Sequence, residues 1–100
     1  MRVTEEGWLR ATAHAMQSPD TVRLFEKVPG SFDLFSLVSY AVYDRIKEED
    51  LTGHLIIEVL VEVIAEVLPD RKPTKGELIR MMALVSFETS VYNAWKAENA

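Results

Sequence analysis

Apolar residues recur along most of the chain at intervals of three and four, the spacing that places them on one face of an α-helix. The longest nearly unbroken apolar run is HLIIEVLVEVIAEVL, residues 54–68, which only Glu58, Glu62 and Glu66 interrupt. On a helix these carboxylates form one narrow acidic stripe, because residues four apart lie above one another. A helix that is apolar around most of its circumference must be covered by the rest of the chain or by a second copy.

The same run also permits a β-strand, because it is rich in valine and a period of two places all three glutamates on one face. Its length of about 15 residues is long for a strand. No other segment alternates well enough to pair with it, and an unpaired strand leaves its backbone groups unsatisfied. These observations favour a helix at about 52–68 that ends at Pro69, and we expect it to be the central helix of the fold.

Capping signals predict four more helices. Thr4 precedes one helix, Ser18 and Pro19 begin a short one at 20–28, and the turn at 29–31 introduces one at 32–47. Thr74 and Glu77 have the spacing of a capping box before a helix at 75–96. The sequence therefore predicts an all-α fold with one domain, 1–100. We expect a small irregular bundle of four longer helices plus one short helix.

Composition narrows the class of protein. One hundred residues are enough for one small core, and an apolar fraction of 48% is at the upper end for such a chain. The absence of cysteine excludes disulfides and thiol chemistry. The start of the sequence lacks the apolar segment of a secretory signal, and no run reaches the roughly 20 apolar residues of a membrane span. We expect a soluble, cytoplasmic protein that does not bind membranes.

The negative charge is concentrated in the middle of the chain. The net charge is −5, and residues 31–68 contain eight acidic and two basic side chains. Binding to nucleic acid is disfavoured, because neutralising phosphates requires a basic surface. An acidic bias instead suits a protein partner with a basic or apolar surface.

No sequence motif indicates catalysis, a cofactor or a nucleotide site. His14 and His54 are the only histidines, and His54 lies one turn from Glu58. His54, Glu58 and Glu62 are the first candidates for a metal or small-molecule site. The chain lacks the Glu-x-x-His pairs of a di-metal bundle, so we expect no metal, no cofactor and no catalytic residues.

Three surfaces are candidates for binding a partner. The first is the acidic stripe, unless arginines of neighbouring helices pair with it. The second is the polar connection that contains Arg71 and Lys72. The third consists of Tyr92 and Trp95 on the last helix, where Leu78, Met81, Met82 and Val85 continue the same helical spacing. The spacing is typical of core residues, although aromatic side chains are also enriched at interfaces. Because three of the predicted helices have apolar stripes wider than one bundle contact requires, we expect a twofold dimer.

We therefore interpret the sequence as a small acidic protein-interaction module without enzymatic activity. It would act as a regulator, an inhibitor or an immunity-type protein, and would form a homodimer. The candidate partner-binding residues are Glu58, Glu62, Glu66, Arg71, Lys72, Tyr92 and Trp95. One alternative is a helical protein that binds a metal or a small molecule. Another is a structural subunit of a larger assembly, such as a phage or secretion component.

Overall fold

The described part of the chain forms five α-helices between its capping residues and turns. The computed structural model describes residues 2–67 and 70–99. The helices are α1 (Glu5–Met16), α2 (Pro19–Lys27), α3 (Ser31–Ile46), α4 (Gly53–Val67) and α5 (Lys75–Glu98). The predicted all-α fold, with four longer helices and one short helix, is confirmed. None of the described helices has both the length and the apolar content that crossing a membrane requires.

The predicted caps of α1 and α5 are present. The Thr4 hydroxyl accepts a hydrogen bond from the backbone N–H of Gly7 at 3.1 Å. At α5 the capping box is reciprocal: the Thr74 hydroxyl accepts from the Glu77 N–H at 3.2 Å, and the Glu77 carboxylate accepts from the Thr74 N–H at 3.3 Å. Each bond satisfies a backbone donor that has no partner within the helix.

The start of α3 and the bounds of α4 refine the predictions. Gly30, with φ of 75°, precedes α3 in the left-handed conformation that glycine adopts without a steric penalty. Ser31 is therefore the first helical residue, and it is buried. The Thr52 hydroxyl accepts a hydrogen bond from the Leu55 N–H at 3.2 Å, one residue before α4 begins. The predicted end of this helix at 68–69 lies outside the described residues.

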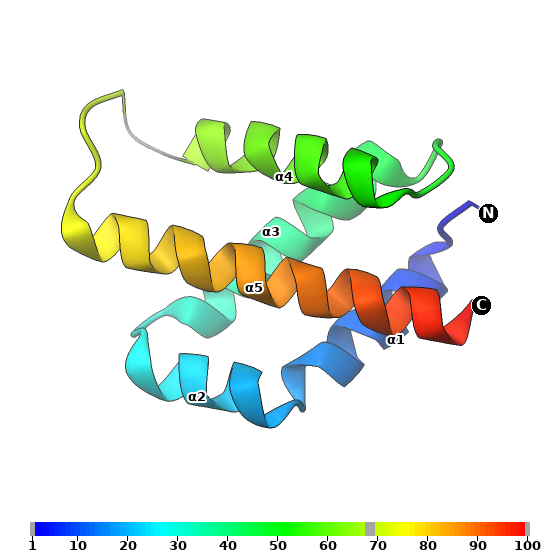
Figure 1. Cartoon of the computed structure of the whole chain (residues 1–100), viewed down its shortest axis with the longest axis horizontal. Helices are drawn as coiled ribbons and strands as arrows, with labels where there is room; N and C mark the ends of the chain where they lie inside the picture. The colour runs from blue at the N-terminus through cyan, green and yellow to red at the C-terminus, as the bar shows by residue number, and fades with distance from the viewer. Residues whose placement is uncertain (1, 68–69, 100) are drawn as a thin grey trace.

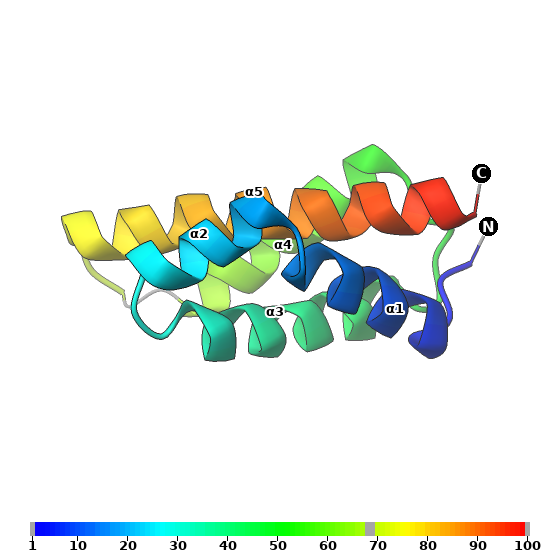
Figure 2. The same ribbon diagram turned by 90° about the horizontal axis from the view of Figure 1, so that it is seen from below.

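The helix in the middle of the bundle is α5 rather than α4. It packs against α1, α3 and α4, whereas α4 packs mainly against α3 and α5 (Figure 1). Seen from below, α5 lies above α3, and α4 slopes from the level of α5 towards that of α3 (Figure 2). The molecule measures 38 × 29 × 18 Å. Its short dimension leaves one side of α4 and of α5 in contact with solvent.

The core combines stacked rings, aliphatic side chains and a few directional bonds. The rings of Phe35 and Phe87 stack with centroids 4.5 Å apart and hold α3 against α5. Between α1 and α3, the Trp8 indole N–H donates to the Ser39 carbonyl at 3.2 Å, and the Thr12 and Ser39 hydroxyls are 2.9 Å apart. These bonds satisfy buried polar groups and fix the position of α1 on α3.

Candidate interaction surfaces

The acidic stripe of α4 is partly neutralised by α3. Arg45 donates from Nη1 to Glu62 Oε2 at 2.9 Å and from Nη2 to Glu66 Oε1. The hydrogen bond and the charge of Glu66, followed by those of Glu62, raise the pKa of Arg45 above its ordinary value. The two carboxylates remain largely exposed, and exposed ion pairs stabilise a fold only weakly. Glu62 and Glu66 therefore already have a partner in their own chain.

Glu58, the third member of the stripe, differs from the other two. Within residues 2–67 and 70–99, no hydrogen bond or ion pair reaches its carboxylate, and its side chain is exposed. It lies at the N-terminal half of α4, one turn before Glu62. Of the predicted acidic ridge, Glu58 is thus the carboxylate that a partner can neutralise.

The basic connection before α5 contributes to the helix start. Arg71 Nη1 lies 2.9 Å from Glu77 Oε1, and the Thr74 hydroxyl donates to the same oxygen at 2.9 Å. Hydrogen bonds from Thr74, with a smaller contribution from Arg71, lower the pKa of Glu77. Arg71 therefore stabilises the capping box, while Lys72 and Lys75 are exposed beside it.

The two aromatic candidates of α5 lie in and beside the core. Trp95 is 6% exposed, and its indole nitrogen is 3.9 Å from the position that a Cβ on Gly7 of α1 would occupy. Tyr92 is half-buried, and its hydroxyl is 3.8 Å from the equivalent position on Gly53 of α4. These side chains pack α5 against its neighbours, and Trp95 offers a partner almost no surface.

Large apolar side chains other than the predicted Tyr92 and Trp95 are exposed on α4 and α5. Val61 is 62% exposed and Met82 is 73% exposed, in contrast to core residues of the same helices. We call the following five residues the α4–α5 face: Ile57, Val61, Leu78, Met82 and Val85. Within each helix they are three, four or seven residues apart, so they lie along one stripe of α4 and one stripe of α5.

Two contacts set the register of these stripes. Gly53 of α4 lies beside Tyr92 of α5 at one end, and Ile64 and Met81 line the same small cavity at the other. The helices are antiparallel, so this register places Val61 opposite Val85. Exposed apolar residues of the two helices therefore lie at the same level of the bundle. The sequence indicated their apolar spacing but not that these residues remain uncovered, because α5 is apolar on its buried side as well.

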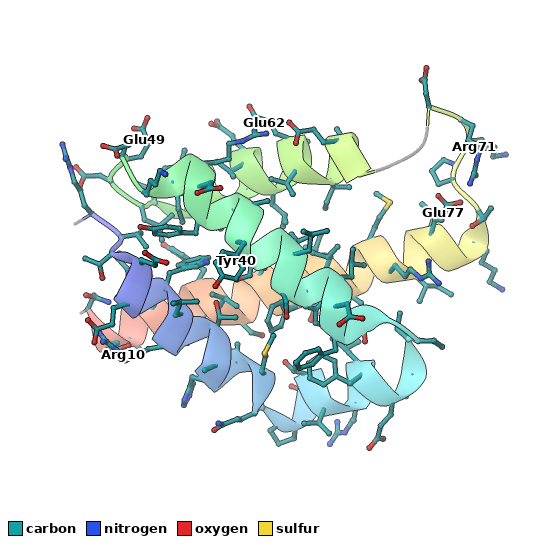
Figure 3. All side chains as sticks on the ribbon, turned by 180° about the vertical axis from the view of Figure 1, so that it is seen from behind. Arg10, Tyr40, Glu49, Glu62, Arg71 and Glu77 are labelled. Carbon is teal, nitrogen blue, oxygen red and sulfur yellow. The ribbon has the colours of Figure 1, made fainter. Side chains whose placement is uncertain are left out.

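A second apolar feature is a groove of about 240 Å³ between α1 and α3. Tyr40 projects from α3 on the side of α1 (Figure 3). The other apolar lining includes Trp8, Leu9, Met16 and Tyr43. The sequence placed the two tyrosines only at the margin of a helix stripe. It gave no signal of a groove, because the groove depends on how far α1 lies from α3.

The most unusual titratable group is Glu88, which the sequence analysis did not select. It is 0% exposed, and neither carboxylate oxygen has a hydrogen-bond partner within the described residues. Burial raises the pKa of Glu88 to about 8, because an apolar interior disfavours the charged form. A signal was available: Glu88 shares a helical face with Leu84 and Val91, both of which are apolar.

Within residues 2–67 and 70–99, no three side chains of histidine, aspartate or glutamate come close enough to hold a metal ion. The candidate set of His54, Glu58 and Glu62 therefore gains no support. No protein-family model, curated protein or solved structure matches this chain, so its function has to be inferred from its own surfaces.

Proposed function

We propose that this protein is a small, non-enzymatic protein-interaction module, of the regulator or inhibitor kind, that binds another polypeptide through the α4–α5 face. One observation carries the proposal: five large apolar side chains are exposed on two helices that pack against each other. Scattered apolar residues are normal on a protein surface, but a contiguous group marks an interaction site. The hypothesis of a subunit in a larger assembly would use the same face.

The test is capture of a partner by tagged full-length protein from host lysate, followed by binding of the purified partner. Val61→Glu places a charge in the centre of the face, whereas Leu37→Glu does so on α3, outside it. The two side chains are matched, because they are 62% and 64% exposed. We expect Val61→Glu to weaken binding of the purified partner at least about 10-fold and Leu37→Glu to leave it unchanged. Equal binding by all three proteins would remove the proposal.

A second candidate function, binding of an apolar small molecule, is supported by the α1–α3 groove. Its aromatic and sulfur-containing walls resemble those of ligand sites, although about 240 Å³ is below the usual size range. A fluorescent naphthalene sulfonate serves as the probe. If the groove binds it, Ala13→Trp should fill the groove and abolish the fluorescence increase, while Val61→Glu should not. An equal increase in both variants would assign the probe to other surfaces.

A further inference from the structure

We propose that the α1–α3 groove binds a small organic cation, with its ammonium group beside Glu5 and Tyr43 and its apolar body directed towards Met16. The inference specifies the ligand of the second candidate function and rests on it, but it is independent of the α4–α5 face. It depends on the register of α1 on α3, on the aromatic rings of the groove, and on the charge of Glu5.

Two hydrogen bonds set the register of α1 on α3. The Trp8 indole N–H and the Thr12 hydroxyl both reach Ser39, so the turn of α1 between them lies beside that residue. The two helices run in opposite directions (Figure 3), and Arg2, before α1, bridges to Asp50, beyond the end of α3. Successive turns towards the start of α1 therefore lie beside successive turns towards the end of α3.

This register gives the groove two different ends. Tyr43 lies at the level of Glu5, and Tyr40 lies at the level of Leu9, one turn further along α1. Met16 lines the groove at the far end. One end of the groove thus combines a carboxylate with phenol rings, whereas the other end is apolar.

The rings provide surface that attracts a cation. The faces of tyrosine and tryptophan rings carry partial negative charge and hold ammonium groups within about 6 Å of the ring centroid. Tyr40 is 57% exposed and Tyr43 is half-buried, so both can contact a ligand. Trp8 is almost fully buried and forms the floor of the groove.

Glu5 gives this end of the groove a negative charge. Among the described residues, it is the only charged one that lines the groove. Its side chain is exposed, and no hydrogen bond or ion pair from residues 2–67 or 70–99 reaches its carboxylate. A cationic ligand would therefore supply the partner that Glu5 lacks within this part of the chain.

The basic side chains around this end of the groove do not reverse its charge. Each of those described has an acidic neighbour: Arg10 with Glu6 and Glu98, Lys47 with Asp44, and Arg2 with Asp50. The acidic groups, with Glu5, outnumber the basic ones. A ligand at this end thus meets a surface with a net negative charge, which favours a cation.

Anions and neutral apolar molecules are the competing ligands. An anion would find no basic side chain among the described lining, so the naphthalene sulfonate probe can use only the apolar walls, with its charge directed away from Glu5. A neutral molecule would contact the same walls without using the carboxylate. A volume of about 240 Å³ also restricts the groove to small ligands.

Titration of the isotope-labelled full-length chain, followed by nuclear magnetic resonance, tests the proposal with two matched probes. One is the meta-hydroxyphenyl-trimethylammonium cation, and the other is meta-tert-butylphenol, in which a neutral carbon replaces the charged nitrogen. We expect the wild type to bind the cation about 5-fold more tightly, with the largest amide shifts near Leu9 and Tyr43. Ala13→Trp, which fills the groove, should abolish binding of both probes.

Removal of single groups isolates the recognition of charge. Glu5→Gln should weaken binding of the cation about 5-fold and leave binding of the neutral phenol unchanged. Glu26→Gln removes the same charge from an exposed position on α2, outside the groove, and should bind both probes as the wild type does. Tyr43→Leu keeps an apolar side chain but should reduce the preference for the cation. Circular dichroism verifies that each variant is helical.

The other outcomes overturn the inference. Equal affinity for the two probes, or a preference for the cation that persists in Glu5→Gln, would leave an apolar small-molecule site but no cation site. Binding that Ala13→Trp does not abolish occurs outside the groove. If the groove binds neither these probes nor the naphthalene sulfonate, the inference and the second candidate function both fail, whereas the α4–α5 face is tested separately by Val61→Glu.

Discussion

The α1–α3 and α4–α5 regions bury and expose apolar groups in different ways. Between α1 and α3 the buried polar groups are paired, with Trp8 bonded to the Ser39 carbonyl and Thr12 bonded to the Ser39 hydroxyl. The outer surface there is a groove. The α4–α5 region instead has an exposed aliphatic face on the outside, and α5 buries the Glu88 carboxylate without a partner among the described residues.

The α1–α3 contact contains hydrogen bonds, whereas the α4–α5 contact is apolar. Directional bonds join α1 to α3 and satisfy the buried polar groups between them. Apolar contacts, which lack direction, hold α5 against α4. In addition, α5 buries the Glu88 carboxyl group, whose pKa is raised by burial, so the stability of the fold depends on the protonation of Glu88. We therefore expect pH to affect the α5 core, hydrogen-bond deletion to affect the α1–α3 contact, and association to depend on the α4–α5 face.

The largest expected effect on stability comes from Glu88. Its pKa rises from the ordinary value of 4.5 to about 8 on folding, so between these values the folded protein holds a proton that the unfolded chain has lost. The free energy of unfolding should therefore fall as pH rises from about 4.5 to about 8, by up to about 5 kcal/mol. Urea unfolding at a series of pH values measures this change.

Glu88→Gln isolates the contribution of the carboxyl group. The variant cannot ionise at this position, so it should lose this part of the pH dependence and be more stable than the wild type at alkaline pH. Glu26→Gln, at an exposed position on α2, is the matched control and should follow the wild-type curve. Parallel curves for the wild type and Glu88→Gln would contradict the account of a buried neutral acid.

A smaller effect is expected from the α1–α3 contact. Thr12→Val keeps the shape of a side chain that is 8% exposed but removes its hydrogen bond to Ser39. We expect a loss of about 1–2 kcal/mol in the free energy of unfolding, equal at pH 5 and pH 8. Thr89→Val is the control, because its exposed hydroxyl bonds only to the Val85 carbonyl of its own helix. A pH-dependent loss in Thr12→Val would mean that the two regions are not separate.

Removing the Tyr40 ring from the α1–α3 groove should change binding of the probe more than it changes the free energy of unfolding. Tyr40 is 57% exposed, so Tyr40→Ala should reduce the free energy of unfolding by less than about 1 kcal/mol. The same variant removes one wall of the groove and should weaken binding of the naphthalene sulfonate probe in a fluorescence titration. Unchanged probe affinity in Tyr40→Ala would show that this region holds no binding site.

The smallest effect is expected at the ion pairs of α4. Arg45→Ala removes the cation between Glu62 and Glu66, but both carboxylates stay hydrated. We expect no resolvable change in melting temperature at physiological salt, because such exposed pairs contribute little. A large decrease would give the stripe a structural importance that its exposure does not indicate.

Local signals in the sequence account for most of the fold. The caps at Thr4, Ser18 and Thr74 depend on side chains close in sequence, so their pattern identifies helix starts directly. The position of α4 at one side of the bundle could not be derived in this way. An apolar helix predicts burial, but not whether its own chain or a second copy covers it.

The candidate surfaces were less predictable, because exposure depends on contacts between distant residues. The pairing of Arg45 with Glu62 and Glu66 joins α3 to α4 across the fold. Trp95 and Met82 belong to the same apolar pattern in the sequence, yet one is in the core and the other is among the more exposed residues. Trp95 is buried and Met82 is exposed because of the directions from which α1 and α4 approach α5.

The central claim is the proposal that the α4–α5 face is an interaction surface. Binding of a purified partner, captured from host lysate, by the wild type beside Val61→Glu and Leu37→Glu tests it most directly. The account predicts equal affinity for the wild type and Leu37→Glu, and an affinity at least about 10-fold weaker for Val61→Glu. Equal binding of the partner by all three proteins would contradict it.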